Sequence, residues 1–356
     1  MTITGPGTTA TPDGNGHRLH GGWYLLALAE ELAGEVTPVE LGDRTLMVIR
    51  DGERLRVFDA RCPHRGADLG YGGKLAPGQA APGQAAPRQA ATFVICPFHG
   101  KRIGLGAGTA RLCVTEHQSV VAGDALFVRL GTDPAEDRGF EQAIKEISAE
   151  KQIVGALIRP IRVPPAYVIE NAFDYSHFTA VHGVGRVTGF GLREDASGGI
   201  AVEGDFWTAV PPTVVQQTAI KQTTKPLADR GLRSRFYARA VSPSLVLSEL
   251  GPPEISHTLI TSALPVGARS AWGAVGSAGN VGGGTAADGC VIRVALGVRP
   301  AALSAVPALV DSVRRNIEQD AVIWDHLDPA APARYDRADL PALAFRQFCA
   351  GFGPLE

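Results

Sequence analysis

The sequence lacks the charge pattern and the long apolar runs that mark several broad classes of protein. Its 34 lysine and arginine residues nearly balance 36 acidic residues, and the formal net charge is −2. A nucleic-acid-binding groove needs a basic patch, and no cluster of basic residues stands out here. No apolar run approaches the roughly 20 residues that a membrane-spanning helix requires. We therefore expect a soluble globular protein without a membrane span, and its length is enough for two domains.

Cysteine is also scarce, and the first residues carry no secretory signal. The five cysteines are Cys62, Cys96, Cys113, Cys290 and Cys349. An odd number scattered over a long chain is a poor disulfide framework, so we expect a cytoplasmic protein with reduced thiols. Residues 1–16, MTITGPGTTATPDGNG, lack a basic region followed by an apolar one, and we expect a disordered tail there.

Short strand-like segments and turns fill residues 17–131, which predicts a small all-β domain. The segment TLMVIRDGERLRVFDA predicts a hairpin around Asp51-Gly52. Residues 76–91 repeat proline, glycine, glutamine and alanine, so they cannot build a core and predict a flexible surface loop. A neutral insertion and a docking segment for a partner are both open readings of this loop.

The composition changes in residues 132–356, which predict a second domain of the α+β class. A helical stretch is expected over 132–156, another around 168–182, and a long late helix over 303–327. The strand-like runs between them predict an antiparallel sheet on which the late helix packs.

Two Cys/His pairs stand on turns that follow predicted strands. The segment RCPHRGADLG contains Cys62-x-His64, and CPFHG contains Cys96-x-x-His99. Two thiolates and two imidazoles can hold zinc or an iron–sulfur cluster. Zinc sites usually pair cysteine with cysteine and histidine with histidine, whereas a Rieske [2Fe-2S] centre uses two histidines on one of its irons. The pattern favours the Rieske centre and leaves zinc as the alternative.

A second candidate metal site lies in ENAFDYSHFTAVHG, residues 170–183. At about 100° per residue, a helix carries Asn171, Asp174, His177 and His182 on one side. The two histidines lie at the edges of this arc, so the helix must bend or end for both to reach one ion. The open alternative is a pair of histidines satisfied at the edge of a core.

The late helix supplies a carboxylate in DSVRRNIEQDAVIWDHLD. Asp320 lies on the apolar stripe of this helix, three residues after Ile317 and four before Trp324. A carboxylate that faces a core is costly unless it is paired or binds a metal. Two histidines and one carboxylate leave positions open on iron for O₂ and substrate. A buried salt bridge to an arginine is the alternative.

Together these motifs resemble the oxygenase (alpha) components of Rieske non-haem iron oxygenases. The segments NAFDYSHF and QDAVIW are most similar to single-component monooxygenases of the ketosteroid-hydroxylase kind. The resemblance implies an N-terminal all-β Rieske [2Fe-2S] domain, followed by a helix-grip (START-like) catalytic domain with an antiparallel sheet. Two departures are that Lys101 replaces the usual aromatic residue after His-Gly, and that the spacer between the Cys/His pairs is longer than usual.

The resemblance also implies the ligand sets and the route of the electrons. Cys62 and Cys96 would hold one iron of the cluster, and His64 and His99 the other. A mononuclear Fe(II) would be held by the residues His177, His182 and Asp320. Asp174 would hydrogen-bond a cluster histidine of a neighbouring subunit, with His99 as the expected partner, and a homotrimer follows from this bridge.

The function implied is that of a terminal oxygenase. The chain shows no nucleotide or flavin fingerprint, so we expect electrons from a separate ferredoxin and/or NAD(P)H reductase. The expected substrates are O₂ and a bulky apolar small molecule, steroid-like or a natural-product intermediate, which is hydroxylated, desaturated, demethylated or cyclised. The pocket candidates, taken from their positions in the predicted elements, are Asn171, Trp207, His257 and Trp272. The alternatives are a Rieske electron carrier or scaffold with an inactive second domain, and a START-like lipid-binding protein with structural zinc.

Overall fold

The computed structural model describes residues 19–77, 91–108, 110–209, 231–251, 256–267, 289–328, 331–353 and 355. The expected tail over 1–16, most of the expected loop over 76–91 and the pocket candidate Trp272 lie outside the described residues. Within the described part of the chain, no helix is both long and apolar enough to cross a bilayer.

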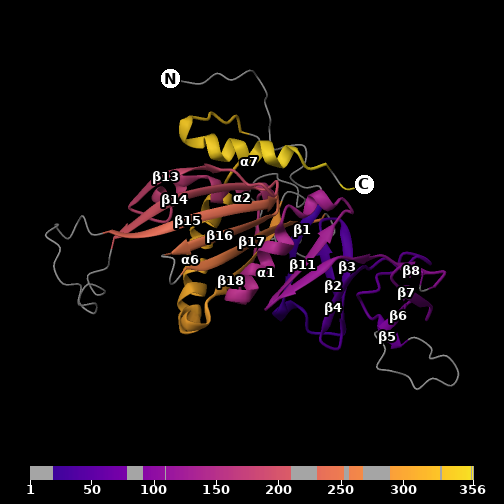
Figure 1. Ribbon diagram of the computed structural model, residues 1–356. Helices are drawn as coiled ribbons and strands as arrows, with labels where there is room; N and C mark the ends of the chain where they lie inside the picture. Colours follow the sequence, from indigo (N-terminus) through magenta and orange to yellow (C-terminus); the bar gives the residue numbers. More distant parts are fainter. Residues whose placement is uncertain are drawn as a thin grey trace.

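The described N-terminal strands form three small sheets (Figure 1). One sheet has the order β1 (Gly22–Leu28), β11 (Ala125–Leu130) and β10 (Ser119–Ala122). Another has the order β2 (Val36–Leu41), β3 (Arg44–Asp51), β4 (Arg54–Asp59) and β9 (Glu116–His117). The third has the order β5 (Lys74–Pro77), β6 (Ala91–Ile95), β7 (Arg102–Leu105) and β8 (Cys113–Val114).

The expected hairpin joins β3 and β4. Asp51 pairs with Arg54 in the antiparallel register, and Gly52 between them has a φ of +64°, which glycine adopts without steric cost. The predicted turn is therefore confirmed by the pairing of the two strands and by the positive φ of its glycine.

Strand β1 is buried along its whole length and serves two cores. Side chains alternate between the two faces of a strand. Trp23 and Leu25 therefore pack with residues of the C-terminal part, whereas Tyr24 and Leu26 pack inside the N-terminal β region. This strand joins the two parts of the molecule.

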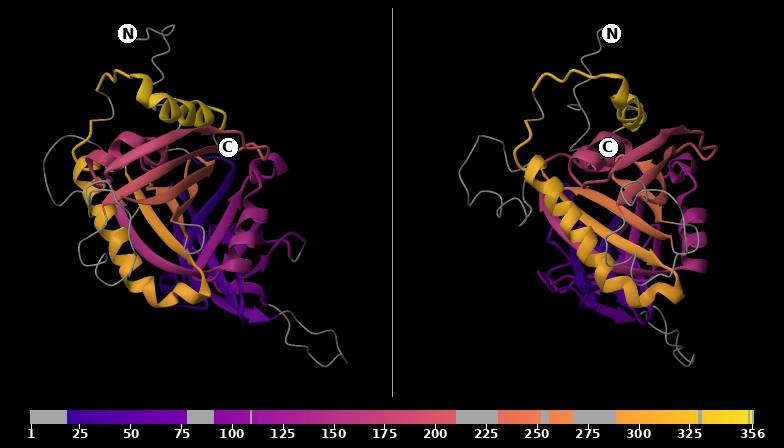
Figure 2. Two further views of the ribbon diagram at one scale, coloured as in Figure 1. Left: turned by 60° about the vertical axis from the view of Figure 1, so that its left-hand side comes forward. Right: turned by 90° about the vertical axis from the view of Figure 1, so that its left-hand side faces the viewer.

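The C-terminal part is built on one large antiparallel sheet. Its described strands run in the order β12 (Gln152–Ile161), β18 (Cys290–Val298), β17 (His257–Pro265), β16 (Leu245–Gly251), β15 (Gly231–Ser242), β14 (Ile200–Ala209) and β13 (Arg186–Arg193). The long helix α6 (Val306–Trp324) lies across one face of this sheet, as Figure 2 shows. The predicted α+β architecture is confirmed.

The two faces of the large sheet carry separate cores. On β18, Ile292 and Val294 belong to the core that includes Val313 and Trp324 of α6. Ala295 of the same strand packs on the opposite face with Phe140 of α1 (Phe140–Glu150). The first face therefore holds the candidate iron site, and the second carries the N-terminal part.

Two predicted helices differ from the structure. The stretch over 132–156 is helical only in the 3₁₀ helix η3 (Pro134–Asp137) and in α1, and β12 already begins at Gln152. The stretch around 168–182 is split into α2 (Pro165–Glu170), the 3₁₀ helix η4 (Asn171–Phe173) and α3 (Tyr175–Ala180). These residues therefore do not share one helical face; the break lies at Asp174, whose backbone is extended.

A C-terminal helix, α7 (Leu340–Ala350), was not predicted from the sequence. It packs against α2 and η4, and the ring of Phe345 stacks on that of Phe173 with 4.9 Å between centroids. This contact supports the segment that leads into the candidate iron site.

Candidate metal centres

The two Cys/His loops form matching turns, after β4 and after β6. The carbonyl of Cys62 accepts a hydrogen bond from the N–H of Gly66 (2.8 Å), and the carbonyl of Cys96 accepts one from Gly100 (3.0 Å). Both glycines have positive φ, +73° and +64°, which lets each chain turn back at once. The loops therefore present their thiols and imidazoles from equivalent backbone positions.

The four side chains meet at one end of the N-terminal region. Both thiols are buried, at 3% and 1% exposure for Cys62 and Cys96. The rings of His64 and His99 have centroids 4.9 Å apart. The Nδ1 atom of His64 is buried and has no hydrogen-bond partner among the described residues, which is costly unless a ligand satisfies it.

The electrostatics of Cys96 favour a thiolate. Burial alone would raise the pKa of this thiol, but backbone N–H donors of Phe98 and His99 and the thiol of Cys62 together lower it below its usual value. Thiolate is the form that binds metal. Two cysteine sulfurs beside two imidazoles, one imidazole having an unsatisfied nitrogen, fit the donor set of a Rieske [2Fe-2S] cluster.

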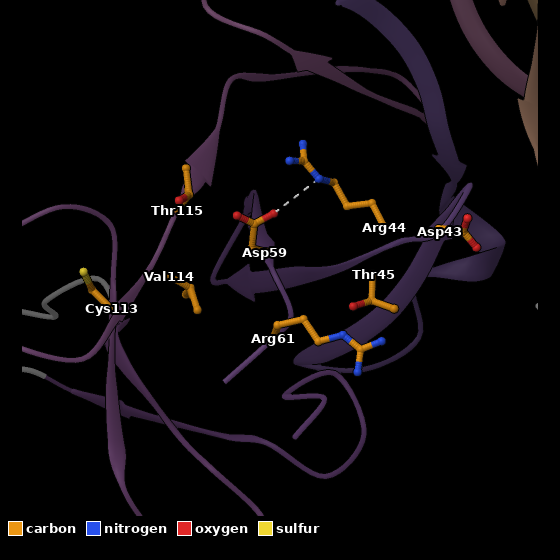
Figure 3. Close-up of a pocket in the computed structure, with 8 residues that line it drawn as sticks. All are labelled: Asp43, Arg44, Thr45, Asp59, Arg61, Cys113, Val114 and Thr115. Carbon is orange, nitrogen blue, oxygen red and sulfur yellow. Dashed lines mark ion pairs between the residues drawn. The ribbon is translucent and has the colours of Figure 1, made fainter. Parts of the chain in front are cut away.

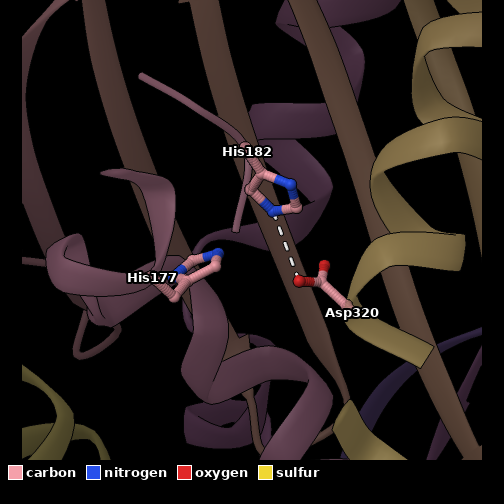
Figure 4. A group of neighbouring side chains, drawn as sticks. All are labelled: His177, His182 and Asp320. Atoms are coloured by element: carbon pink, nitrogen blue, oxygen red, sulfur yellow. Dashed lines mark ion pairs between the residues drawn. The ribbon is translucent and has the colours of Figure 1, made fainter. Parts of the chain in front are cut away.

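The second candidate site gathers residues from α3, from the turn after it, and from α6. The ligand atoms of His177, His182 and Asp320 all lie within 4.8 Å of one another (Figure 4). Asp320 is 6% exposed, and its Oδ1 lies 3.3 Å from Nε2 of His182. Among the described residues, Asp320 thus pairs with this histidine and not with an arginine.

Local structure explains how the two histidines converge. Asp174 caps α3, since its carboxylate accepts a hydrogen bond from the N–H of Ser176 at 2.8 Å. Helix α3 ends at Ala180, and Gly183 with a φ of +66° turns the chain beyond it. The short helix therefore carries His177, and the turn returns His182 beside it, with ring centroids 5.1 Å apart.

The Nδ1 atom of each histidine is engaged away from the site. Nδ1 of His177 donates to the backbone carbonyl of Asp174 at 2.6 Å, and Nδ1 of His182 donates to Oε1 of Gln319 at 3.0 Å. A hydrogen bond at one ring nitrogen sets the tautomer and leaves the other nitrogen to a metal. Both Nε2 atoms are then available on the side of Asp320.

The three side chains also influence one another's charge. Burial lowers the pKa of His177, although the Asp174 carbonyl and the charge of Asp320 oppose this shift. Burial would also lower the pKa of His182, but its hydrogen bonds to Asp320 and Gln319 outweigh burial and raise it. Two imidazoles and a carboxylate fit a mononuclear Fe(II), and open positions on the ion would remain.

The pocket candidates are scattered around this site. Asn171 is half-buried in η4. His257 lies on the same face of β17 as Ala263, which belongs to the core shared with α6. Trp207 lies on the face of β14 opposite to Phe206 of that core, and its ring N–H donates to Thr188 at 3.1 Å. Of the two strand residues, only His257 therefore lies on the face of the supporting core.

The sequence did not single out the other residues that border the site. The ring of Phe178 lies 4.1 Å from that of His177, and it contacts Phe206 (4.6 Å) and Phe236 (5.2 Å). Gln319 was missed as well, although it directly precedes Asp320. Aromatic residues on strands are ordinary core residues in a sequence, so only the fold reveals that these lie beside two histidines.

A separate hollow lies in the N-terminal region (Figure 3). Its volume is about 430 Å³, and it is lined by Asp43, Arg44, Thr45, Asp59, Arg61, Cys113, Val114 and Thr115. Arg44 and Asp59 face each other across it at 3.9 Å. None of the three residues of the candidate iron site lines it, so we do not assign it to the substrate.

Comparison with known proteins gives one domain match and one sequence relative. Residues 22–122 match the family of the Rieske [2Fe-2S] domain. The chain is 35% identical over 95 residues to cholesterol 7-desaturase nvd of Drosophila melanogaster. That match covers 26% of this chain and 18% of the relative, so the matched region is less than a fifth of that protein.

Solved structures match nearly the whole chain at low identity. Dicamba monooxygenase bound to dicamba is 16% identical with a TM-score of 0.62, covering 93% of this chain and 96% of that one. NdmB of Pseudomonas putida CBB5 is 17% identical with a TM-score of 0.57, covering 91% and 88%. The oxygenase in the oxygenase–ferredoxin complex of carbazole 1,9a-dioxygenase is 13% identical with a TM-score of 0.60, covering 94% and 90%. The chain therefore contains a Rieske [2Fe-2S] domain, and its overall fold is similar to that of these solved oxygenase structures.

Proposed function

We propose that the protein is a terminal oxygenase, a Rieske-type non-haem iron monooxygenase that oxidises C–H bonds of a bulky apolar small molecule. The observation that carries this proposal is the convergence of His177, His182 and Asp320 within 4.8 Å of one another. An electron carrier needs only the cluster, and a second set of metal ligands would have no role in it. Iron bound at this set would supply the O₂ chemistry, and the protein would bind and orient the substrate.

Electrons would enter at the cluster end of the molecule. The side chains of Phe98 and Tyr71 are 64% and 63% exposed there. Phe98 lies in the second cluster loop, and Gly72, next to Tyr71, approaches Pro97 of that loop. Exposed aromatic residues are frequent at protein interfaces, so this end can receive a ferredoxin and/or an NAD(P)H reductase. The oxygenase–ferredoxin complex of carbazole 1,9a-dioxygenase supports such a partner.

The route onward would cross between subunits of a homotrimer. Within one chain, the sheet β5–β8 lies at one end of the molecule, while α6 and β13 lie at the other (Figure 1). Asp174 is half-buried at the start of the helix that carries His177, so its carboxylate can hydrogen-bond His99 of a neighbouring subunit. This bridge would hold the cluster histidine in one tautomer and pass the electron.

The aromatic residues beside the site support an apolar substrate. Phe178, Phe206 and Phe236 form a continuous aromatic group next to His177. Such a wall favours an apolar ring system, steroid-like or a natural-product intermediate, with Asn171 and His257 as candidate polar contacts. Hydroxylation, desaturation, demethylation and ring closure all fit this site. A cytoplasmic location, expected from the scattered cysteines, is part of the proposal.

The first prediction tests the site with two carboxylates of α6. The protein is reduced chemically, exposed to O₂ with a panel of steroids and other apolar ring compounds, and the products are analysed by mass. Asp320→Ala should lose one iron per chain and all product, because a buried ligand is removed, while acid-labile sulfide stays unchanged. Glu318→Ala is the control, since its side chain is 57% exposed and pairs with Arg159 away from the histidines. Product from Asp320→Ala at the wild-type level would refute the assigned site.

A further inference from the structure

We infer that Gln319 is a positioning residue for the mononuclear iron, because its side-chain carbonyl accepts the Nδ1 proton of His182. The inference rests on the proposed function and assigns a role to a residue outside the three ligands. Oε1 of Gln319 lies 3.0 Å from Nδ1 of His182, and Nε2 of the same ring lies 3.3 Å from Oδ1 of Asp320.

The chemistry of the ring connects these two distances. A neutral imidazole carries one N–H, and a carbonyl oxygen can only accept. The bond to Gln319 therefore keeps a proton of His182 on Nδ1, so that Nε2, which faces Asp320, is the nitrogen left for a metal. Without an acceptor at Nδ1, the proton could move to Nε2, and the ring would then have to lose it before binding a metal.

His182 depends on this contact more than His177 depends on its own. The acceptor for His177 is the backbone carbonyl of Asp174, which the start of α3 holds in place. His182 follows the end of α3, so no helical backbone fixes its ring. Adjacent residues of α6 thus supply both a ligand and the group that orients the ligand opposite.

Because Gln319 is exposed, its effect on the position of His182 can be tested without a large loss of packing. Gln319 is exposed on α6, whereas Asp320 is buried. Replacing an exposed side chain removes little apolar contact, so a change in metal binding would come from the lost hydrogen bond. The acceptor is a neutral amide, and a glutamate carboxylate at the same position would be a stronger acceptor.

The test compares Gln319→Met with Gln319→Glu in the full chain with its cluster. Methionine has a similar length without the carbonyl acceptor, and glutamate restores an acceptor. Mononuclear iron is removed by brief chelation, and Fe(II) binding is measured by anaerobic equilibrium dialysis, together with the spectrum of Co(II) bound in its place. Acid-labile sulfide and the melting temperature serve as controls for folding.

We expect Gln319→Met to bind Fe(II) about 10- to 100-fold more weakly than the wild type and to change the Co(II) spectrum, with sulfide and melting temperature unchanged. Gln319→Glu should bind at least as tightly as the wild type. Equal affinity and equal spectra for the wild type and Gln319→Met would overturn the inference alone. A wild-type protein that binds no metal after reconstitution would overturn the proposed function with it.

Discussion

At the scale of single residues, the candidate sites consist of buried polar groups whose partners are few. Asp320 is almost fully buried and pairs with His182, and Nδ1 of His64 has no partner in the part of the chain that the structure describes. Such groups cost free energy in an apolar region unless a bound ion or a hydrogen bond satisfies them. Both candidate metal sites contain such a costly buried group, which is consistent with a functional role for each site.

His20 gives a second prediction, on the pH dependence of stability. Its Nδ1 donates to the Gly21 carbonyl and its Nε2 contacts Ser244, while burial, aided by the charge of Arg138, lowers the pKa of this histidine to about 4. The unfolded state takes up the proton near pH 6.5, so stability is complete above that pH and falls between pH 6.5 and 4. The expected fall is about 3 kcal/mol.

The measurement is urea unfolding of the wild type and of His20→Gln at pH 7.5 and pH 4.5. The variant should lose most of this fall, because it has no imidazole to protonate. His326→Gln is the matched control, since His326 is exposed and its removal should leave the pH dependence unchanged. Parallel pH profiles for the wild type and His20→Gln would contradict the assigned burial effect.

At this scale the sequence singled out the candidate ligands that the structure brings together, but it did not single out Gln319. Cysteine, histidine and aspartate at metal-ligand spacings carry a chemical signal of their own. An exposed glutamine carries none, and its role depends on how α6 is rotated relative to the turn after α3. Trp207 lies on the face opposite to the core for a similar reason, because the register of a strand with its neighbours sets which side chains face the core.

At the scale of elements, strong local sequence patterns predicted the observed turns and helices correctly, whereas weaker periodicity did not. The Asp51-Gly52 turn and the apolar stripe of α6 each predicted the observed element. The predicted single helix over 168–182 is instead broken at Asp174, whose φ and ψ are −104° and 103°. Aspartate competes for backbone N–H groups and caps α3, which periodicity of apolar residues does not reveal.

Turn glycines give a third prediction, at the contact between β10–β11 and β12. Gly123 has a φ of +54°, and a Cβ there would lie 2.0 Å from the carbonyl oxygen of Ile153. Gly123→Ala should lower the free energy of unfolding by about 3 kcal/mol or more, since backbone must move in addition to the strain of positive φ. The readout is urea unfolding at neutral pH.

Gly52→Ala is the matched control for Gly123→Ala. Gly52 has a similar φ of +64° but nothing within 4 Å of the position of a Cβ. Its replacement should therefore cost only the backbone strain, about 1 kcal/mol. Equal losses in the two variants would show that the hairpin does not dock on β12 as described.

At the scale of the whole molecule, the order of the two domains was predictable and their packing was not. The contact between them includes β1 and a partly buried ion pair, in which Arg293 of β18 donates to Glu31 at 2.7 and 2.8 Å. Neither residue stands out in the sequence, because pairs distant in the chain leave no local pattern. The resulting arrangement separates the cluster loops from the iron site within one chain.

Asp174 provides a fourth prediction, on transfer between subunits. Asp174→Ala and Asp174→Ser should both retain cluster and mononuclear iron yet abolish turnover with a reductase, because neither side chain can reach a neighbouring histidine. Serine keeps the cap of α3, which separates loss of the bridge from loss of the helix start. Turnover and metal content are measured on the same preparations. Near-normal turnover in Asp174→Ser would rule out the bridging role.

The central claim is that one chain holds a Rieske cluster and a mononuclear iron. The most direct test is the amount of iron and acid-labile sulfide per chain in anaerobically purified protein. Our account predicts about three irons and two sulfides, two irons in the cluster and one on the histidine–carboxylate site. About two irons and two sulfides, unchanged after addition of ferrous iron, would contradict it and favour an electron carrier. Zinc without sulfide would contradict it as well and favour a structural metal in a lipid-binding protein.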